Sequence, residues 1–218
     1  MLKKLFDNTR STSLANSFRR KRLKLFLELA DKYEKPVRVL DVGGTENYWK
    51  QMGLLGNPDY ELTITNIEGS FDESDQQFRF INADASSLGM FGDKSFDIVF
   101  SNSMIEHIPN AAKRQQAAEE IARIGKSYLV QTPAYWIAIE PHFLFPFFQL
   151  LPRFLKLLLV RNFNMGWFKK CNSKEEAAEL IDSIRLLKKP ELSRLFPNSL
   201  IHTERVFFMS KSYLAIKQ

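Results

Sequence analysis

The sequence is poor in cysteine and lacks an uninterrupted apolar stretch of the length needed to cross a membrane. Cys171 is the one cysteine among 218 residues, so nothing favours an oxidising compartment. The most apolar stretch, 143–160, contains two prolines together with Arg153 and Lys156, whereas a spanning helix needs about 20 mostly uncharged residues. The first residues lack the apolar core of a secretory signal. We therefore expect a cytoplasmic protein.

Low-complexity tracts, internal repeats and linkers are also absent. Hydrophobic residues make up 44% of the chain and charged residues 26%, which is typical of a globular protein. The length predicts a single domain spanning residues 1–218. Within it we expect an N-terminal basic helix in residues 1–35, and a lid or insertion of apolar and basic character at residues 134–170.

The net charge of +6 is unevenly distributed. Arg19–Arg22 and Lys24 crowd the first predicted helix. A second basic group surrounds the apolar stretch and consists of Arg153, Lys156, Arg161, Lys169 and Lys170. Clustered basic residues favour a nucleic acid, an acidic membrane surface or an anionic substrate, while a solvated helix face is the simpler interpretation.

Short β-branched runs alternate with helical patterns along most of the chain. Strands are predicted at 37–42, 60–67, 78–81, 96–100 and 127–130, and helices at 13–33 and 113–124. Two further strand-like runs, 201–209 and 212–216, are separated only by Ser210 and Lys211, which allows a hairpin but no helical crossover. We therefore expect an α/β fold: a Rossmann-like, doubly wound, mostly parallel seven-stranded sheet with a C-terminal antiparallel hairpin and helices on both faces.

The first predicted strand ends in a glycine turn, Asp41-Val42-Gly43-Gly44. Ligands of open α/β sheets bind at the carboxyl ends of strands, where glycine lets a ligand approach the backbone. The turn matches neither G-x-G-x-x-G nor a P-loop, which disfavours dinucleotides and phosphates. Asp41 before the turn and Glu46 after it repel phosphate but attract an ammonium or a hydroxyl. The turn predicts a site for a cationic cofactor without phosphate; the alternative is a structural turn with a capping aspartate.

Two more carboxylates follow the next strands in register. Glu68, followed by Gly69, ends the second strand, where a carboxylate can accept hydrogen bonds from both hydroxyls of a ribose. Asp84, followed by Ala85, comes after the third strand and can accept a hydrogen bond from an exocyclic amine. The alternative for Asp84 is to cap the turn or helix that follows.

These residues resemble the class I S-adenosylmethionine-dependent methyltransferases, in particular the type 11 group. The sequence departs from the family pattern where a third glycine is expected: Glu46 and Asn47 stand there, and Thr45 would compensate through its hydroxyl. The resemblance covers roughly residues 36–133 and rests on four motifs in order: Val39–Gly44, Ile67–Gly69, Ala83–Ala85, and Phe96–Asn102 with Ile105–Ile108.

The resemblance implies S-adenosylmethionine as the cofactor. Glu68 would hold the ribose, Asp84 with the Ala85 amide would recognise the adenine, and Asn102 with Ser103 would line the methionine and the methyl exit. The glycine turn would carry the methionine end. The complete implied set is Asp41, Gly43, Gly44, Thr45, Glu46, Glu68, Gly69, Asp84, Ala85, Asn102 and Ser103.

Two histidines are candidate catalytic residues. The sulfonium cofactor is already an activated methyl donor, so the protein must align the acceptor and exclude water, and a hydroxyl acceptor also needs a base. His107 follows the fourth strand and His142 follows the fifth. The alternatives are a packing or cofactor-orienting role for His107 and a bracing role for His142. His202 belongs to the tail hairpin, and we assign no metal ligand.

The segment after the fifth strand is predicted to determine which acceptor the protein binds. It can be a lid over the acceptor, an amphipathic element in peripheral contact with a membrane through residues 143–161, or a core helix. We expect a small-molecule, lipid-like or glycan-linked acceptor. A nucleic-acid methyltransferase is an alternative, although Ser101–Met104 replaces the N/D-P-P-Y/F tetrapeptide of enzymes that modify base amino groups. A non-catalytic cofactor-binding or membrane-surface protein is a further alternative.

Overall fold

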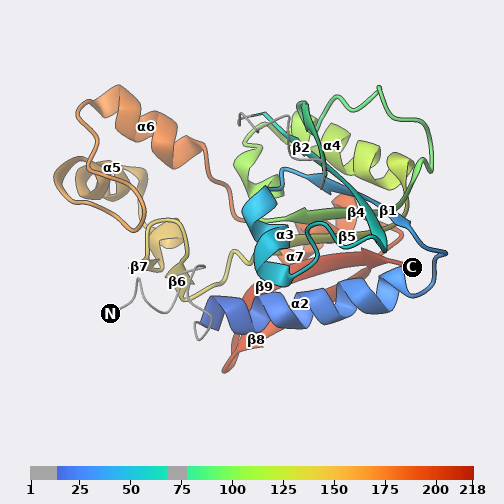
Figure 1. Ribbon diagram of the computed structural model, residues 1–218. Coiled ribbons are helices and arrows are strands. Elements are labelled where there is room, and N and C mark those ends of the chain that lie inside the picture. The colour runs from blue at the N-terminus through green and yellow to red at the C-terminus, as the bar shows by residue number, and fades with distance from the viewer. Residues whose placement is uncertain (1–13, 68–77) are drawn as a thin grey trace.

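The computed structural model describes residues 14–67 and 78–218 and contains a seven-stranded sheet (Figure 1). Its strand order is β3-β2-β1-β4-β5-β9-β8. The first five strands run parallel, and β9 lies antiparallel to both β5 and β8. The predicted fold class is confirmed. The strand bounds are β1 Val37–Val42, β2 Tyr60–Asn66, β3 Arg79–Asn82, β4 Phe96–Asn102, β5 Gly125–Pro133, β8 Leu200–Val206 and β9 Met209–Lys217.

Helices cover both faces of this sheet because side chains alternate along each strand. On one face Val39 packs with Phe26 and Trp49, and on the other Leu40 packs with Ile121. Burying each of these side chains contributes about 1.5–3 kcal/mol. Figure 1 shows α2 and α4 on opposite sides of the sheet. The helices are α2 (Leu14–Ala30) and α3 (Glu46–Met52) on the first face, and α4 (Ala111–Ile124) and α7 (Lys189–Leu195) on the second.

The C-terminal hairpin turns at Phe207 and Phe208, so the predicted turn at Ser210 and Lys211 was wrong. The apolar run at 206–209 has the composition of a strand interior, yet Phe207 and Phe208 are 91% and 99% exposed at the tip. Because the observed turn comes three residues before the predicted one, Glu204 pairs with Ser212 across the two strands. This register brings polar side chains of the hairpin toward the carboxyl ends of the parallel strands.

A small folded unit, here called the side lobe (residues 134–184), separates β5 from α7. Figure 1 shows it beside the sheet. Its own apolar core consists of Phe143, Phe148, Val160, Met165, Cys171, Ala177 and Ile181, so packing continues past residue 170 into α6. In the described part of the chain, no helix combines the length and apolar character of a membrane span. The elements of the lobe are β6 Ile139–Glu140, β7 Phe145–Pro146, the 3₁₀ turn η2 Phe148–Leu150, α5 Arg153–Asn162 and α6 Lys174–Asp182.

Candidate active site

The glycine turn lies between β1 and α3, at the point where the strand order reverses between β1 and β4. Gly43 has φ +76°, in the left-handed region, and its backbone N–H donates to the Thr65 carbonyl at 2.7 Å. A Cβ on Gly44 would overlap the Asp41 carboxylate, and one on Gly43 would overlap the Met104 side chain. Both glycines are therefore required by close packing at the turn.

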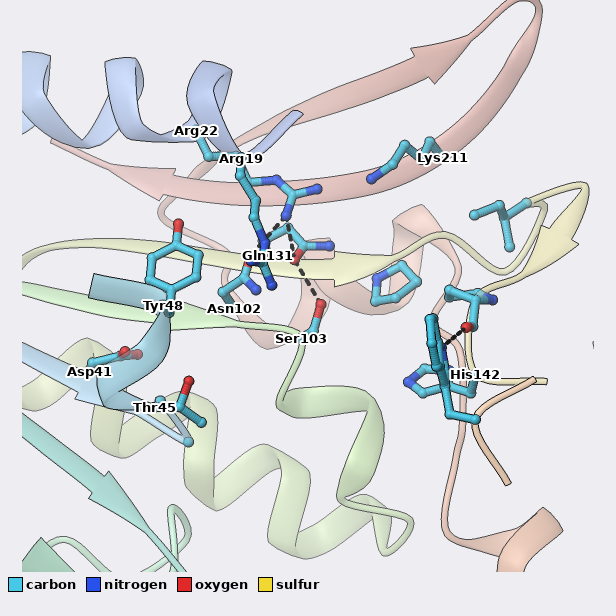
Figure 2. Close-up of a pocket in the computed structure, with 16 residues that line it drawn as sticks. Arg19, Arg22, Asp41, Thr45, Tyr48, Asn102, Ser103, Gln131, His142 and Lys211 are labelled. Carbon is cyan, nitrogen blue, oxygen red and sulfur yellow. Dashed lines mark hydrogen bonds between the residues drawn. The ribbon is translucent and has the colours of Figure 1, made fainter. Parts of the chain in front are cut away.

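A cavity of about 390 Å³ opens above this turn. The side lobe closes one end through Ile137, Pro141, His142 and Trp167. Figure 2 shows Asp41, Thr45 and Tyr48 on one side of the cavity and His142 on the other, with Arg19 and Arg22 beside Asn102 and Gln131. The remaining lining residues are Gly43, Gly44, Ser103, Pro133 and Lys211. We call this space the first cavity.

Asp41 is a buried carboxylate under the turn, 1% exposed. Its Oδ2 accepts a hydrogen bond from the Trp49 indole N–H at 2.6 Å. Its Oδ1 is buried without a hydrogen-bond partner among the described residues. Burial raises the pKa of Asp41 to about 7, although the Trp49 hydrogen bond opposes the shift. A ligand that carries a hydrogen-bond donor can supply the partner that this oxygen lacks.

Arg22 of α2 is buried at the opposite wall of the first cavity. Its guanidinium donates to both carboxylate oxygens of Glu204 at 2.9 and 2.6 Å, and to Asn102 Oδ1 at 2.8 Å. It also donates to Gln131 Oε1, which accepts from the Ser103 hydroxyl at 3.0 Å. This network fixes the polar side chains at the ends of β4 and β5.

Two more cations line the first cavity, and the wall is positive overall. Arg19 stands over the Tyr48 ring and donates to Gln51. Lys211 lies 3.7 Å from Glu204 Oε2. Burial, and then the charge of Arg22, lower the pKa of Lys211 to about 7. An anionic group is the complementary ligand for this wall.

A second cavity, of about 340 Å³, adjoins the first at Gly43 and Ser103. Asp84 is part of its lining and also makes local contacts: Oδ1 accepts from the Ser86 backbone N–H at 2.9 Å, and Oδ2 accepts from Lys113 at 3.2 Å. The Ser86 backbone and hydroxyl donors, with Lys113, lower the pKa of Asp84. The other lining residues are Asn66, Ile67, Ala83, Ala85, Met104, His107 and Ile108.

His142, from the lining of the first cavity, contacts His107, from the lining of the second. Their Nε2 atoms lie 3.2 Å apart, and His142 Nδ1 lies 2.6 Å from Glu140 Oε1. The surrounding protein, and then the charge of His142, lower the pKa of His107 to about 4. Burial, the largest single effect, would lower the pKa of His142, but the hydrogen bond to Glu140 and the negative charges of Glu140 and Glu106 together outweigh it and raise the pKa. Burial raises the pKa of the neighbouring Glu106 to about 7.

The structure gathers most of the sequence-predicted site residues around the two cavities. Glu46 begins α3 and lines neither cavity. Glu68 and Gly69 lie outside the described residues. His202 lies on β8, and it too lines neither cavity. The predicted residues that do line a cavity are Asp41, Gly43, Gly44, Thr45, Asn102, Ser103 and His142 for the first, and Asp84, Ala85 and His107 for the second.

Sequence reasoning missed the polar wall made by Arg22, Gln131, Glu204 and Lys211. One signal was available for Arg22. It lies four residues from both Phe18 and Phe26, on the buried stripe of α2, rather than on the solvated face that the basic cluster suggested. No comparable signal marks Lys211, because its position depends on the hairpin register.

A doubly wound sheet with a glycine turn at its switch point, an acidic side chain beneath the turn and two adjoining cavities is typical of α/β proteins that bind a nucleoside cofactor. Residues 40–128 match the model of the type 11 methyltransferase domain family. Over this matched part, from β1 to β5, the chain is similar to methyltransferases, which supports S-adenosylmethionine as the cofactor. No curated protein matches the sequence.

Solved structures similar to this chain share its fold at low sequence identity. A SAM-dependent methyltransferase from Aquifex aeolicus has 14% identity and a TM-score of 0.50, and the match covers 99% of this chain and 96% of that one. One from Methanosarcina mazei has 14% identity and a TM-score of 0.51, covering 87% and 94%. The 1,6-didemethyltoxoflavin-N1-methyltransferase of Burkholderia thailandensis, solved with 1,6-didemethyltoxoflavin and S-adenosylhomocysteine, has 12% identity and a TM-score of 0.54, covering 97% and 81%.

Proposed function

We propose that the protein transfers the methyl group of S-adenosylmethionine to a small acceptor that enters the first cavity from the side lobe. The observation that carries this proposal is the meeting of the two cavities at Gly43 and Ser103. A cofactor lying across this junction presents its methionine end to the first cavity and its adenosine to the second. The methyl group then faces the lobe end, near His142.

The residues present fit both ends of the cofactor. The ammonium group of the methionine end matches the unpaired Asp41 Oδ1, and its carboxylate matches the cationic wall with Arg19 and Lys211. The lack of a Cβ at Gly44 lets the Asp41 carboxylate lie directly against the backbone of the turn. Asp84 and the Ala85 amide remain our candidates for the adenine, and Glu68 for the ribose.

The chain's own contribution to the reaction is alignment and exclusion of water. The bound cofactor supplies an activated methyl group, so holding the acceptor in line with it contributes on the order of 7–11 kcal/mol. Ile137, Pro141 and Trp167 close the acceptor end of the cavity. Glu140 accepts from His142 Nδ1 and so leaves the lone pair on Nε2, the atom that faces His107, where it can act as a base or a ligand atom. His107 and His142 therefore remain our catalytic candidates.

A lipid-like acceptor is the finer hypothesis, and one observation favours it. On and near α5, Phe154, Leu158 and Phe163 are 67%, 56% and 58% exposed, and Trp167, which lines the first cavity, is 50% exposed. Exposed apolar side chains grouped this way mark a surface for an apolar partner. Arg153, by contrast, is paired with Asp182, which weakens the case for anionic headgroups.

A nucleic-acid acceptor fits the structure less well. Arg22, a member of the basic cluster that motivated that alternative, is buried in its ion pair with Glu204 and is withdrawn from the surface. A surface of phosphate contacts would need exposed cations and would make binding fall steeply with salt. We therefore place a small or lipid-like molecule first.

Transfer of a labelled methyl group tests the choice of acceptor. The purified protein is incubated with labelled S-adenosylmethionine and either extracted lipids or a water-soluble metabolite fraction. We expect label in the lipid fraction, reduced at least tenfold in a Trp167→Ala, Phe163→Ser variant, with Lys24→Ala as the matched surface control. Label confined to water-soluble products would exclude the lipid-like acceptor and leave the small-molecule proposal standing.

A further inference from the structure

Three side chains of metal-ligand type converge where the side lobe contacts the 3₁₀ turn that follows β4. Glu106 and His107 come from the 3₁₀ turn η1 (Ile105–His107) after β4, and His142 comes from the side lobe. One ligand atom from each lies within 4.8 Å of the other two. The two segments are far apart in the sequence, so the fold, and not local spacing, creates the cluster.

The distance between the two imidazoles is close to that expected when both bind the same metal ion. His107 Nε2 and His142 Nε2 are 3.2 Å apart. Two nitrogens bound to one Zn²⁺ at about 2.0–2.1 Å in tetrahedral geometry lie about 3.3–3.4 Å from each other. The pair is therefore close to the arrangement that a metal ion would require.

Glu140 prepares His142 for this role. Its Oε1 accepts from His142 Nδ1, which leaves the lone pair on Nε2, the atom that faces His107. Its Oε2 accepts from the backbone N–H groups of His142 and Phe143 at 2.9 and 2.7 Å. A carboxylate that fixes the tautomer and orientation of a histidine in this way is the usual partner of a metal-bound imidazole.

Glu106 supplies an independent observation. Its side chain is 0% exposed, and Oε2 accepts a hydrogen bond from the Thr132 hydroxyl at 2.9 Å. Its Oε1 is buried without a hydrogen-bond partner among the residues that the structure describes. Leaving a buried carboxylate oxygen unpaired is costly, and a cation on that oxygen removes the cost.

We propose that Glu106, His107 and His142 bind a divalent transition-metal ion of the Zn²⁺ type. Two imidazoles disfavour Mg²⁺, which prefers oxygen ligands and water. Three protein ligands of the His₂Glu type leave a position open for water or substrate, as in catalytic zinc sites. Because the sequence has no compact metal-binding spacing, our expectation of no metal ligand is revised here.

The metal site indicates the chemical class of the acceptor, and this part of the inference rests on the proposed function. His142 lines the first cavity and His107 the second, and with the cofactor placed as proposed the open position would lie on the side of the methyl group. A hydroxyl oxygen bound there loses its proton to solvent more readily because the metal lowers its pKa. The oxygen then forms a bond to the methyl carbon, and the carbon–sulfur bond breaks with its electron pair remaining on sulfur. The acceptor is thus an alcohol or a phenol.

Titration of the full-length protein with Zn²⁺ after treatment with a chelator tests the site without using activity. We expect one equivalent to bind, and anomalous scattering at the zinc edge to locate it between Glu106, His107 and His142. Affinity should fall at least tenfold in His107→Ala and in His142→Ala. Glu140→Gln, which alters only the positioning of His142, should weaken binding about 10–100-fold. His202→Ala, at an exposed histidine of β8, is the matched control and should bind as the wild type does.

Two measurements separate failure of this site from failure of the cofactor proposal. His107 is exposed, so His107→Ala should fold normally, and its melting temperature checks this. Binding of S-adenosylhomocysteine to the same variants reports on the cofactor site alone. Absence of Zn²⁺ binding, equal binding in the histidine variants, a zinc peak at Cys171, or Mg²⁺ bound in preference to Zn²⁺ would each overturn the proposal, whatever the result for the cofactor.

Discussion

Asp41 illustrates how one buried side chain can favour ligand binding at the expense of stability. Its Oδ2 is paired with Trp49, whereas its Oδ1 has no partner in the described part of the structure. The charged groups that line the cavity on the opposite side are Arg19, which stands over the Tyr48 ring, and Arg22. The unpaired oxygen is what we expect of a binding site whose last partner is the ligand.

The variant Asp41→Asn should stabilise the ligand-free protein at neutral pH and weaken cofactor binding. In the folded protein the pKa of Asp41 is about 7, above its ordinary value of 3.8. The folded state therefore holds a proton that the unfolded state releases, and the wild type loses stability as the pH rises from about 4 to 7. A shift of this size corresponds to at most about 4 kcal/mol.

Urea unfolding at pH 5 and at pH 8 measures this difference. We expect the free energy of unfolding of the variant to exceed that of the wild type at pH 8, and the gap to shrink at pH 5. The affinity for S-adenosylhomocysteine should fall at least tenfold, about 1.4 kcal/mol. A variant that binds as tightly as the wild type would remove Asp41 from the site.

On the scale of elements, α2 and the hairpin β8–β9 together build the wall of the first cavity. Arg22 occupies the apolar stripe of α2 between Phe18 and Phe26, and its guanidinium is bound at both carboxylate oxygens of Glu204 on β8. Breaking a buried ion pair by removing one partner leaves the other charge uncompensated. The helix and the hairpin are therefore coupled through this pair.

Replacing Arg22 with methionine should destabilise the protein by about 3–5 kcal/mol, and replacing Glu204 with glutamine by a comparable amount. The double variant should lose less than the sum of the two, because each single variant already breaks the pair. Thermal or urea unfolding of all three measures the coupling. Lys24→Ala removes an exposed cation of the same helix and should change stability by less than about 1 kcal/mol. Additive losses would show that the two charges do not act together.

The hairpin tip makes a separate prediction. Phe207 has φ +52°, which strains the backbone of a non-glycine residue. Its side chain is almost fully exposed, so burial does not offset this strain. Phe207→Gly should stabilise the protein by about 0.5–1 kcal/mol, since glycine suits the first central position of such a turn. Phe208 does not have a positive φ, and Phe208→Gly should instead be neutral or destabilising. Equal effects of the two substitutions on the melting temperature would contradict this turn geometry.

At the scale of the whole molecule, the sheet could be predicted because strand and helix patterns alternate and each pattern is local. The glycine turn, Asp84 and Asn102 could be assigned to one edge of the sheet because the carboxyl ends of parallel strands meet there. Lys211 could not be assigned, since its place depends on where the hairpin turns. The cluster of Glu106, His107 and His142 depends on how the side lobe folds back, and no sequence period encodes that.

The central claim is that S-adenosylmethionine spans the junction of the two cavities at Gly43 and Ser103. A crystal structure with S-adenosylhomocysteine tests it most directly. We predict the amino group of the ligand within hydrogen-bonding distance of Asp41 Oδ1, its carboxylate against Arg19 or Lys211, and its adenine beside Asp84 and the Ala85 amide. A ligand bound away from the glycine turn, or both cavities empty at saturating ligand, would contradict the account.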